Sequence, residues 1–214
     1  MLLCSMSPDH DESHVHNLLP AEPALRVKAL ETILLEKGLL DQKAVDAIID
    51  EYEQRIGPHI GAEIVARAWS DSAFKSILLE DSVAVLREAG IAGRQGEHVV
   101  VVENTEKTHN LVVCTLCSCY PWPLLGVPPA WYKSDAYRSR AVSEPRAVLS
   151  EFGINIPKIQ SVRVWDSTAE IRYLVLPMQP KDSVGLPISD LAKWVTRNSM
   201  IGTGLPLRPS DDHI

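Results

Sequence analysis

Apolar residues in the first half of the chain recur at helical spacing. Val27, Leu30 and Leu34 lie on one face of a helix that is expected to begin near Pro23 and to end at Gly38. Similar spacing continues beyond Gly38, so this half of the chain is predicted to be helical.

A second helix is expected between a cap at Asp41 and Gly57, with an apolar face formed by Val45, Ile48, Ile49, Tyr52 and Ile56. A third helix and one or two more are expected before Gly90. Their apolar positions are Ile60, Ile64, Val65 and Ala68, then Phe74, Ile77 and Leu78, then Val85, Leu86 and Ala89.

The pattern then changes to short valine-rich runs that are typical of strands. The two runs of each pair are joined by a short polar segment, and we interpret them as pairs of sequence neighbours, 98–103 with 110–114 and 162–166 with 171–176. A helix bracketed by Pro145 and Gly153 is predicted between the pairs. A last short helix is predicted over 189–196.

Composition and charge narrow the class of protein. The apolar fraction of 45% and the charged fraction of 23% are ordinary for a soluble globular domain. The net charge of -7, with 21 basic residues interspersed among 28 acidic ones, argues against nucleic-acid binding. No apolar run is long enough to cross a bilayer, and the polar residues soon after Met1 do not resemble a signal peptide. We therefore expect a cytoplasmic protein without a membrane segment.

Three of the four cysteines crowd into six residues, at Cys114, Cys117 and Cys119. A structural zinc site needs a fourth ligand, and His109 does not complete a common zinc spacing. An iron–sulfur cluster normally takes four cysteines. A redox pair would leave Cys119 without a role. These comparisons favour a different kind of metal site.

A compact metal claw is compatible with this spacing. Only Ser118 separates Cys117 from Cys119, so two sulfurs and the intervening backbone amides can face one ion, with Cys114 as a further ligand. Deprotonated amide ligands require a strongly Lewis-acidic metal, most readily a trivalent one. Thiolates held in this way are open to oxidation to sulfenic and sulfinic acid. Five protein donors would leave one octahedral position free.

The organisation predicted is an α+β fold, with a helical N-terminal arm followed by a mixed α/β metal-binding domain that has a small layered β-sheet core. Residues 1–20 are expected to form a disordered tail, 21–90 the helical segment, 91–205 the catalytic domain and 206–214 a second tail. The helical segment is expected to pack partly on a partner subunit, and packing on its own domain is the alternative.

The run 113–123 and the following segment 125–133 closely resemble the alpha subunit of nitrile hydratases. The resemblance covers about residues 22–205. It includes further segments at 26–31, 57–59, 61–62, 68–69, 95–97, 102–105, 137–140, 164–166, 195–197 and 199–202. The chain is thus identified as resembling this family over most of its length.

The resemblance implies an unequal set of sulfurs around one metal ion. Cys114 is implied to bind as a thiolate, Cys117 as the sulfinic form and Cys119 as the sulfenic form, together with the backbone nitrogens of Ser118 and Cys119. Thr115 and Tyr120 are typical of the cobalt type, whereas the iron type usually has serine at the position of Thr115. One Co(III) ion per subunit is therefore expected, with Fe(III) as the alternative.

The implied reaction is hydration of a nitrile to an amide, with either activated water or the Cys119 sulfenate oxygen as the nucleophile. A beta subunit, in a heterodimer or an α2β2 heterotetramer, is implied to supply arginines to the oxidised sulfurs. A small activator protein is implied for cobalt insertion. Gln95 is implied to orient water or substrate, although a turn residue is an equal alternative.

Two aromatic side chains are expected at the substrate. Trp122 and Tyr120 are implied to line the pocket, although Trp122 between two prolines could equally be a packing wedge. Asp166 and Glu170 match acidic positions of the family, and an acidic turn between strands is the simpler explanation. Histidine can bind metals, but His59, His98 and His109 are expected to be ordinary polar or partly buried residues and not ligands.

Two rival functions stay open. The gamma subunit of thiocyanate hydrolase has the same claw, but that relative tends to carry arginine where this chain has Trp122. A non-catalytic cobalt carrier would not need the pocket-like stretch 120–133. Nitrile hydration is therefore the preferred prediction.

Overall fold

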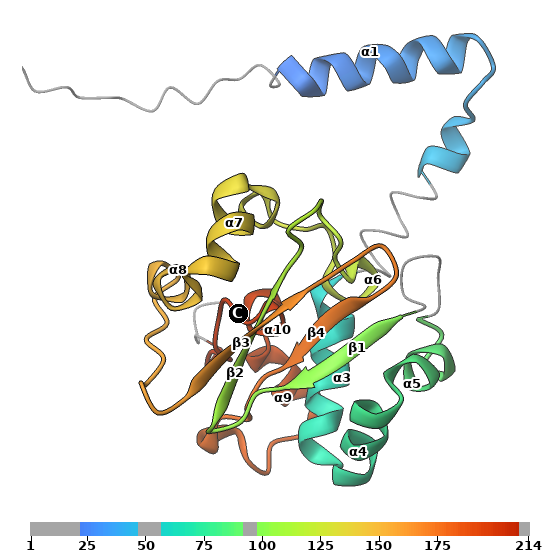
Figure 1. The fold of residues 1–214 in the computed structure, drawn as a ribbon. Helices are drawn as coiled ribbons and strands as arrows, with labels where there is room; N and C mark the ends of the chain where they lie inside the picture. The colour runs from blue at the N-terminus through green and yellow to red at the C-terminus, as the bar shows by residue number, and fades with distance from the viewer. Residues whose placement is uncertain (1–21, 47–56, 92–97, 210–214) are drawn as a thin grey trace, which may run out of the picture. The chain divides into compact units, whose positions relative to one another are not determined.

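The computed structural model describes residues 22–46, 57–91 and 98–209 (Figure 1). The chain divides into two units, Met1–Ile48 and Ile49–Ile214. In the first unit, helix α1 (Glu22–Glu36) has the predicted extent. Gly38 adopts a positive φ of 63°, and the amide of Leu39 donates to the carbonyl of Leu34, as at many helix ends.

The chain becomes helical again at residue 42. The Asp41 carboxylate accepts a hydrogen bond from the amide of Lys43, so the predicted cap is confirmed. The remainder of the second predicted helix, residues 47–56, lies outside the described residues.

The described part of the second unit starts with three helices in series, as predicted: α3 (Pro58–Ser70), α4 (Ser72–Glu80) and α5 (Ser82–Glu88). Two aspartates separate and cap them, because the carboxylate of Asp71 accepts from the amides of α4 and that of Asp81 from α5. Most predicted apolar positions are buried, whereas Ile77 and Ala89 are exposed.

Four strands form where valine-rich runs predicted them: β1 (Val99–Glu103), β2 (Thr108–Val113), β3 (Ser161–Asp166) and β4 (Arg172–Leu176). The predicted pairing of sequence neighbours is wrong. β1 pairs in parallel with β4, and β2 pairs in parallel with β3. Parallel strands need long crossover connections and are often covered on both faces, which fits the continuous buried runs of β2 and β4. β3 differs, because none of its residues is buried.

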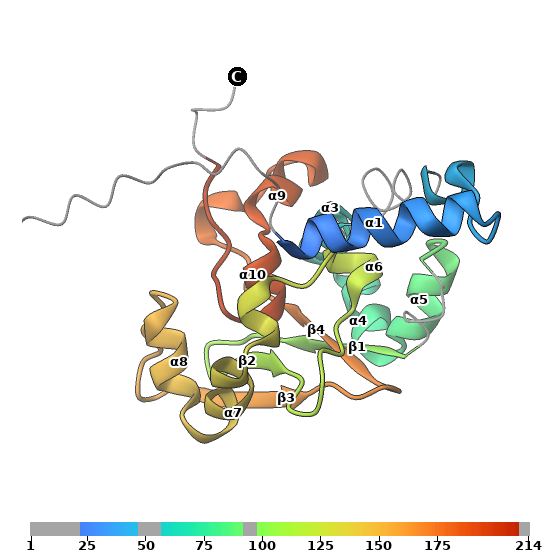
Figure 2. The same ribbon diagram turned by 90° about the horizontal axis from the view of Figure 1, so that it is seen from above.

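Helices cover the two small sheets on different sides (Figure 2). α4 and α5 pack against β1. On the other sheet, α7 packs against β2 and α8 against β3. The elements between β2 and β3 are α6 (Trp122–Leu125), the 3-10 helix η1 (Ala130–Lys133), α7 (Asp135–Ser143) and α8 (Pro145–Glu151), of which only α8 is predicted from sequence.

The C-terminal part contains the 3-10 helix η2 (Lys181–Ser183), the predicted helix α9 (Ile188–Trp194) and α10 (Arg197–Ile201). α10 begins with a reciprocal cap between Thr196 and Ser199 and ends at Gly202, whose φ is 93°. A Cβ at Gly202 would lie 2.0 Å from the carbonyl oxygen of Asn110, so only glycine fits this approach to β2.

The predicted α+β fold class is confirmed by this arrangement of helices around two small sheets. None of the helices in the described ranges is long and apolar enough to cross a membrane.

Candidate metal centre

Strand β2 delivers the first cysteine of the cluster. Its residues from His109 to Val113 are buried, and Cys114 follows directly with no exposed surface. The amide of Ser167, just after β3, donates to the carbonyl of Val113 at 2.7 Å. Cys114 is therefore anchored at the end of a paired strand, and an irregular loop leads from it to α6.

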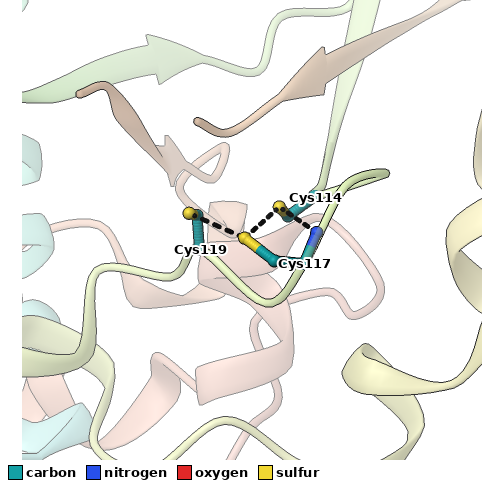
Figure 3. A group of neighbouring side chains, drawn as sticks. All are labelled: Cys114, Cys117 and Cys119. Atoms are coloured by element: carbon teal, nitrogen blue, oxygen red, sulfur yellow. Dashed lines mark hydrogen bonds between the residues drawn. The ribbon is translucent and has the colours of Figure 1, made fainter. Parts of the chain in front are cut away.

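The loop brings the three cysteines together (Figure 3). The Sγ atom of Cys117 lies 3.4 Å from that of Cys114 and 3.2 Å from that of Cys119. All three sulfurs lie within 4.8 Å of one another. Cys114 is buried, Cys119 is half-buried and Cys117 is exposed. Such a cluster can hold a metal ion and leaves one side accessible.

Backbone amides also face this cluster. The amide of Cys117 donates to Sγ of Cys114 at 3.3 Å. Hydrogen bonds from the thiols of Cys119 and Cys114, and from the amides of Cys119 and Ser118, lower the pKa of Cys117 to about 7. Burial, followed by the hydrogen bond with Cys117, raises the pKa of Cys119 to about 12. Cys117 is thus the first of these two thiols to become a thiolate, the form that binds metal.

The first part of the loop is held through every hydrogen-bonding group of Thr115. Its amide and hydroxyl donate to the carboxylate of Asp166 at 2.9 and 2.6 Å. Its carbonyl oxygen accepts from Nη2 of Arg138 at 2.7 Å. Asp166 therefore supports the cysteine loop, and the simpler explanation of an acidic turn does not apply to it.

The end of the loop is held by a residue that follows it in the sequence, Tyr132. The buried hydroxyl of Tyr132 donates to the carbonyl of Cys119 at 2.9 Å. Tyr132 packs edge-on against Tyr120 and Trp131. Neither Tyr132 nor Arg138 is singled out by the sequence, because their contacts with the loop depend on the tertiary fold.

The other predicted site residues lie in different environments. Ser118 is exposed on the loop, whereas Tyr120 is buried and burial raises the pKa of its phenol. Trp122 is half-buried at the start of α6 and packs against the hydrophobic core. Gln95 lies outside the described residues.

His109 is a structural histidine rather than a fourth ligand. Its Nε2 lies 2.7 Å from the carbonyl oxygen of Gly202, so this nitrogen carries the proton and donates. Its Nδ1 faces the side-chain amide of Asn104 at 3.5 Å. Among the described residues, the metal-binding cluster contains the three cysteines and no histidine.

Comparisons with known proteins agree with this geometry. The family model described as nitrile hydratase, alpha chain, matches residues 21–204. The low-molecular weight cobalt-containing nitrile hydratase subunit alpha of Rhodococcus rhodochrous is 53% identical over 88% of this chain and 91% of its own. The thiocyanate hydrolase subunit gamma of Thiobacillus thioparus is 36% identical over 83% of this chain and 77% of its own.

The fold also matches solved structures. A double mutant of the Fe-type nitrile hydratase from Comamonas testosteroni Ni1 superposes with a TM-score of 0.81 at 36% identity, covering 89% of this chain and 94% of that one. Because the family model and the similar proteins span most of the chain, this chain belongs to the nitrile hydratase alpha chain family.

Proposed function

We propose that this chain is the metal-binding alpha subunit of a nitrile hydratase, which hydrates nitriles to amides at a non-corrin Co(III) centre. The observation that carries the proposal is the convergence of three cysteine sulfurs within 4.8 Å on one loop. The amides of Ser118 and Cys119, which donate to the sulfur of Cys117, face the same cluster.

The donors suit a trivalent ion with a preference for sulfur and nitrogen. The sulfurs of Cys114, Cys117 and Cys119 and the backbone nitrogens of Ser118 and Cys119 would hold it. When bound, such an ion acts as a Lewis acid that activates the nitrile or water. The exposed side of the cluster at Cys117 leaves access for a small molecule.

We further propose that Cys117 carries the sulfinic and Cys119 the sulfenic group, while Cys114 stays a thiolate. Oxidation follows the accessibility of a thiol. Cys117 and Cys119 retain accessible surface, whereas Cys114 is fully buried at the end of β2. The exposure of Cys117 and Cys119 thus supports their oxidation, and the burial of Cys114 supports its remaining a thiolate.

The remaining site residues would serve the substrate. Trp122 and Tyr120 are proposed to line the pocket, Ser118 to donate to an oxidised sulfur, and Gln95 to orient water or nitrile. Water adds across the carbon–nitrogen triple bond, and both of its hydrogens remain in the amide. The residues of this chain therefore have to bind and orient two small molecules beside the sulfur cluster.

A beta subunit is proposed to complete the site, in a heterodimer or an α2β2 heterotetramer. Exposed apolar residues on α1 support a partner contact, namely Leu25, Val27, Leu30, Ile33 and Leu34. The partner is proposed to supply arginines to the oxidised sulfurs. An activator protein for cobalt insertion and a cytoplasmic location complete the proposal.

Cobalt is preferred over iron for two reasons. Thr115 and Tyr120 follow the cobalt-type pattern, and the relative at 53% identity is named cobalt-containing. The Fe-type structure is only 36% identical. Metal analysis of protein produced with cobalt, and separately with iron, tests the choice, because only the cognate metal should reach one ion per chain.

The decisive experiment measures hydration of a simple nitrile by the chain produced with its beta subunit and cobalt. Amide formation supports the proposal, whereas release of carbonyl sulfide from thiocyanate without nitrile hydration would assign the thiocyanate hydrolase function. Stoichiometric metal without either activity would favour a cobalt carrier. Trp122 and the lower 36% identity of the thiocyanate hydrolase relative make the second outcome the less expected one.

A further inference from the structure

At each end of the cysteine loop, one side chain donates a hydrogen bond to a backbone carbonyl of the loop, and neither side chain contacts the sulfurs through this bond. Nη2 of Arg138 donates to the carbonyl of Thr115 at 2.7 Å, and the hydroxyl of Tyr132 donates to the carbonyl of Cys119 at 2.9 Å. We infer that Arg138 and Tyr132 are positioning residues that set the spacing of the metal donors. This inference rests on the proposed function, because it concerns the metal that the loop would hold.

Of the two partners of Arg138 among the described residues, the carbonyl of Thr115 is the closer one. Its Nη1 also pairs with Asp135 at 3.3 Å, but the Asp135 side chain is fully exposed, so water weakens that attraction. The Arg138 side chain is only 23% exposed. A hydrogen bond from a charged donor is shorter and stronger than one between neutral groups. Arg138 therefore acts mainly on the peptide group between Thr115 and Leu116.

Asp166 and Arg138 together fix the orientation of Thr115. The carboxylate holds the amide and hydroxyl of Thr115, while Arg138 holds its carbonyl. With both flanking peptides fixed, the backbone on either side of Thr115 cannot rotate freely. The position of Cys114 relative to the rest of the loop then depends on both β3 and α7.

Tyr132 acts on the other end of the loop. Its side chain is fully buried, and its ring contacts Tyr120 and Trp131 edge-on at centroid distances of 5.0 and 6.0 Å. A side chain locked by packing can hold a hydrogen-bond partner in one place. Between these two hydrogen-bonded carbonyls, Leu116 and Cys117 are exposed, so the spacing of the sulfurs depends on the ends of the loop.

Matched variants separate positioning from general stability. Tyr132→Phe is compared with Tyr137→Phe, because Tyr137 also donates a buried hydroxyl to a backbone carbonyl, that of Val112 at 2.6 Å. Arg138→Ala is compared with Arg140→Ala, whose side chain pairs with Glu151 on the same helix pair. Each is produced with the beta subunit and cobalt, and metal content, sulfur-to-metal charge-transfer absorption, kcat, KM and Tm are measured.

We expect Tyr132→Phe and Arg138→Ala to lower metal affinity or kcat by about 10- to 100-fold and to shift the absorption band. Tyr137→Phe should lower the Tm comparably to Tyr132→Phe while leaving the band of bound cobalt unchanged, and Arg140→Ala should leave both metal content and band unchanged. Arg138→Lys, which keeps a charged donor, should restore part of the wild-type absorption.

The inference would be overturned if the two loop-facing variants kept the wild-type band and metal content, or if Tyr137→Phe shifted the band as much as Tyr132→Phe. Should Arg138→Ala fail to fold, Arg138→Lys is compared with Arg140→Lys: a shifted band or a reduced metal content in Arg138→Lys alone supports the inference, and a wild-type band with full metal content in both variants contradicts it. A wild-type protein that binds cobalt but hydrates no nitrile would refute the proposed function and leave the absorption test intact.

Discussion

The carboxylate of Asp166 accepts two hydrogen bonds from Thr115, one from its amide at 2.9 Å and one from its hydroxyl at 2.6 Å. These residues are 51 positions apart and join the end of β3 to the cysteine loop. We expect Asp166→Ala to lower the free energy of unfolding by about 1–2 kcal/mol, because both bonds are lost at an exposed site. Denaturant titration measures this change.

Thr115 provides the matched control for that bond. Thr115→Ser keeps the hydroxyl and should change the free energy of unfolding by less than about 0.5 kcal/mol, whereas Thr115→Val removes the donor and should cost about 1 kcal/mol. Equal stability of the serine and valine variants would mean that the hydroxyl bond contributes nothing.

Cobalt binding should depend on the three clustered cysteines and not on the fourth cysteine of the chain. Replacing Cys114, Cys117 or Cys119 with serine is expected to reduce bound cobalt to background, because each sulfur belongs to the same cluster. Cys4→Ser, at the fourth cysteine of the sequence, which lies outside the described residues, serves as the control and should retain the metal. Mass spectrometry of the metal-loaded protein should show two additional oxygen atoms on Cys117 and one on Cys119. Unmodified cysteines in an active enzyme would contradict the assignment.

Stability should fall in mildly acidic solution because of His109. Burial lowers the pKa of this side chain below the value of about 6.5 that is usual for histidine, although the hydrogen bond with Gly202 partly opposes the shift. The folded state therefore binds the proton less readily than the unfolded state. The contribution of His109 is complete above pH 6.5 and is lost as the pH falls toward the lowered value.

Chemical denaturation at several pH values tests this dependence. The contribution of His109 to the slope is at most about 1.4 kcal/mol per pH unit, since a single proton is involved. His109→Gln, which cannot titrate, should be less stable at neutral pH but should show a shallower decline between neutral and acidic pH. An unchanged slope in that variant would assign the decline to other groups.

Gly202 should tolerate no side chain. Gly202→Ala combines a φ of 93° with a Cβ only 2.0 Å from the carbonyl oxygen of Asn110, so we expect a loss of about 3 kcal/mol or more in the free energy of unfolding. Gly185→Ala is the control, because φ is 86° but the added Cβ meets no atom within 4 Å. Its cost should be limited to about 1 kcal/mol of backbone strain. Equal losses would mean that the approach to β2 is not tight.

The apolar face of α1 should matter for assembly rather than for folding. Leu30 is 61% exposed, so Leu30→Asp should weaken binding of the beta subunit without lowering the Tm of the isolated chain. Thr32→Asp places the same charge on an exposed position on the side of the helix opposite Leu30. Size-exclusion chromatography of the mixed subunits should show a smaller loss of complex for Thr32→Asp, and equal losses would argue against an apolar contact.

Elements with strong local patterns could be predicted from sequence. Helices α3 to α5 have apolar residues at helical spacing and aspartate caps, and both signals depend only on near neighbours. Helix α7 was missed because only Tyr137 and Ala141 are buried on it, too few to produce a periodic pattern. Helix α10 was missed because five residues are too short to show one.

Cys114, Cys117 and Cys119 are so close along the chain that a single loop can gather their sulfurs, so the cluster could be predicted from sequence. The contacts that hold this loop depend on the tertiary fold. Asp166, Arg138 and Tyr132 reach it from 51, 23 and 13 positions away. Such contacts depend on the parallel pairing of β2 with β3 and on the packing of α7 against β2, and no local periodicity encodes which distant segments become neighbours.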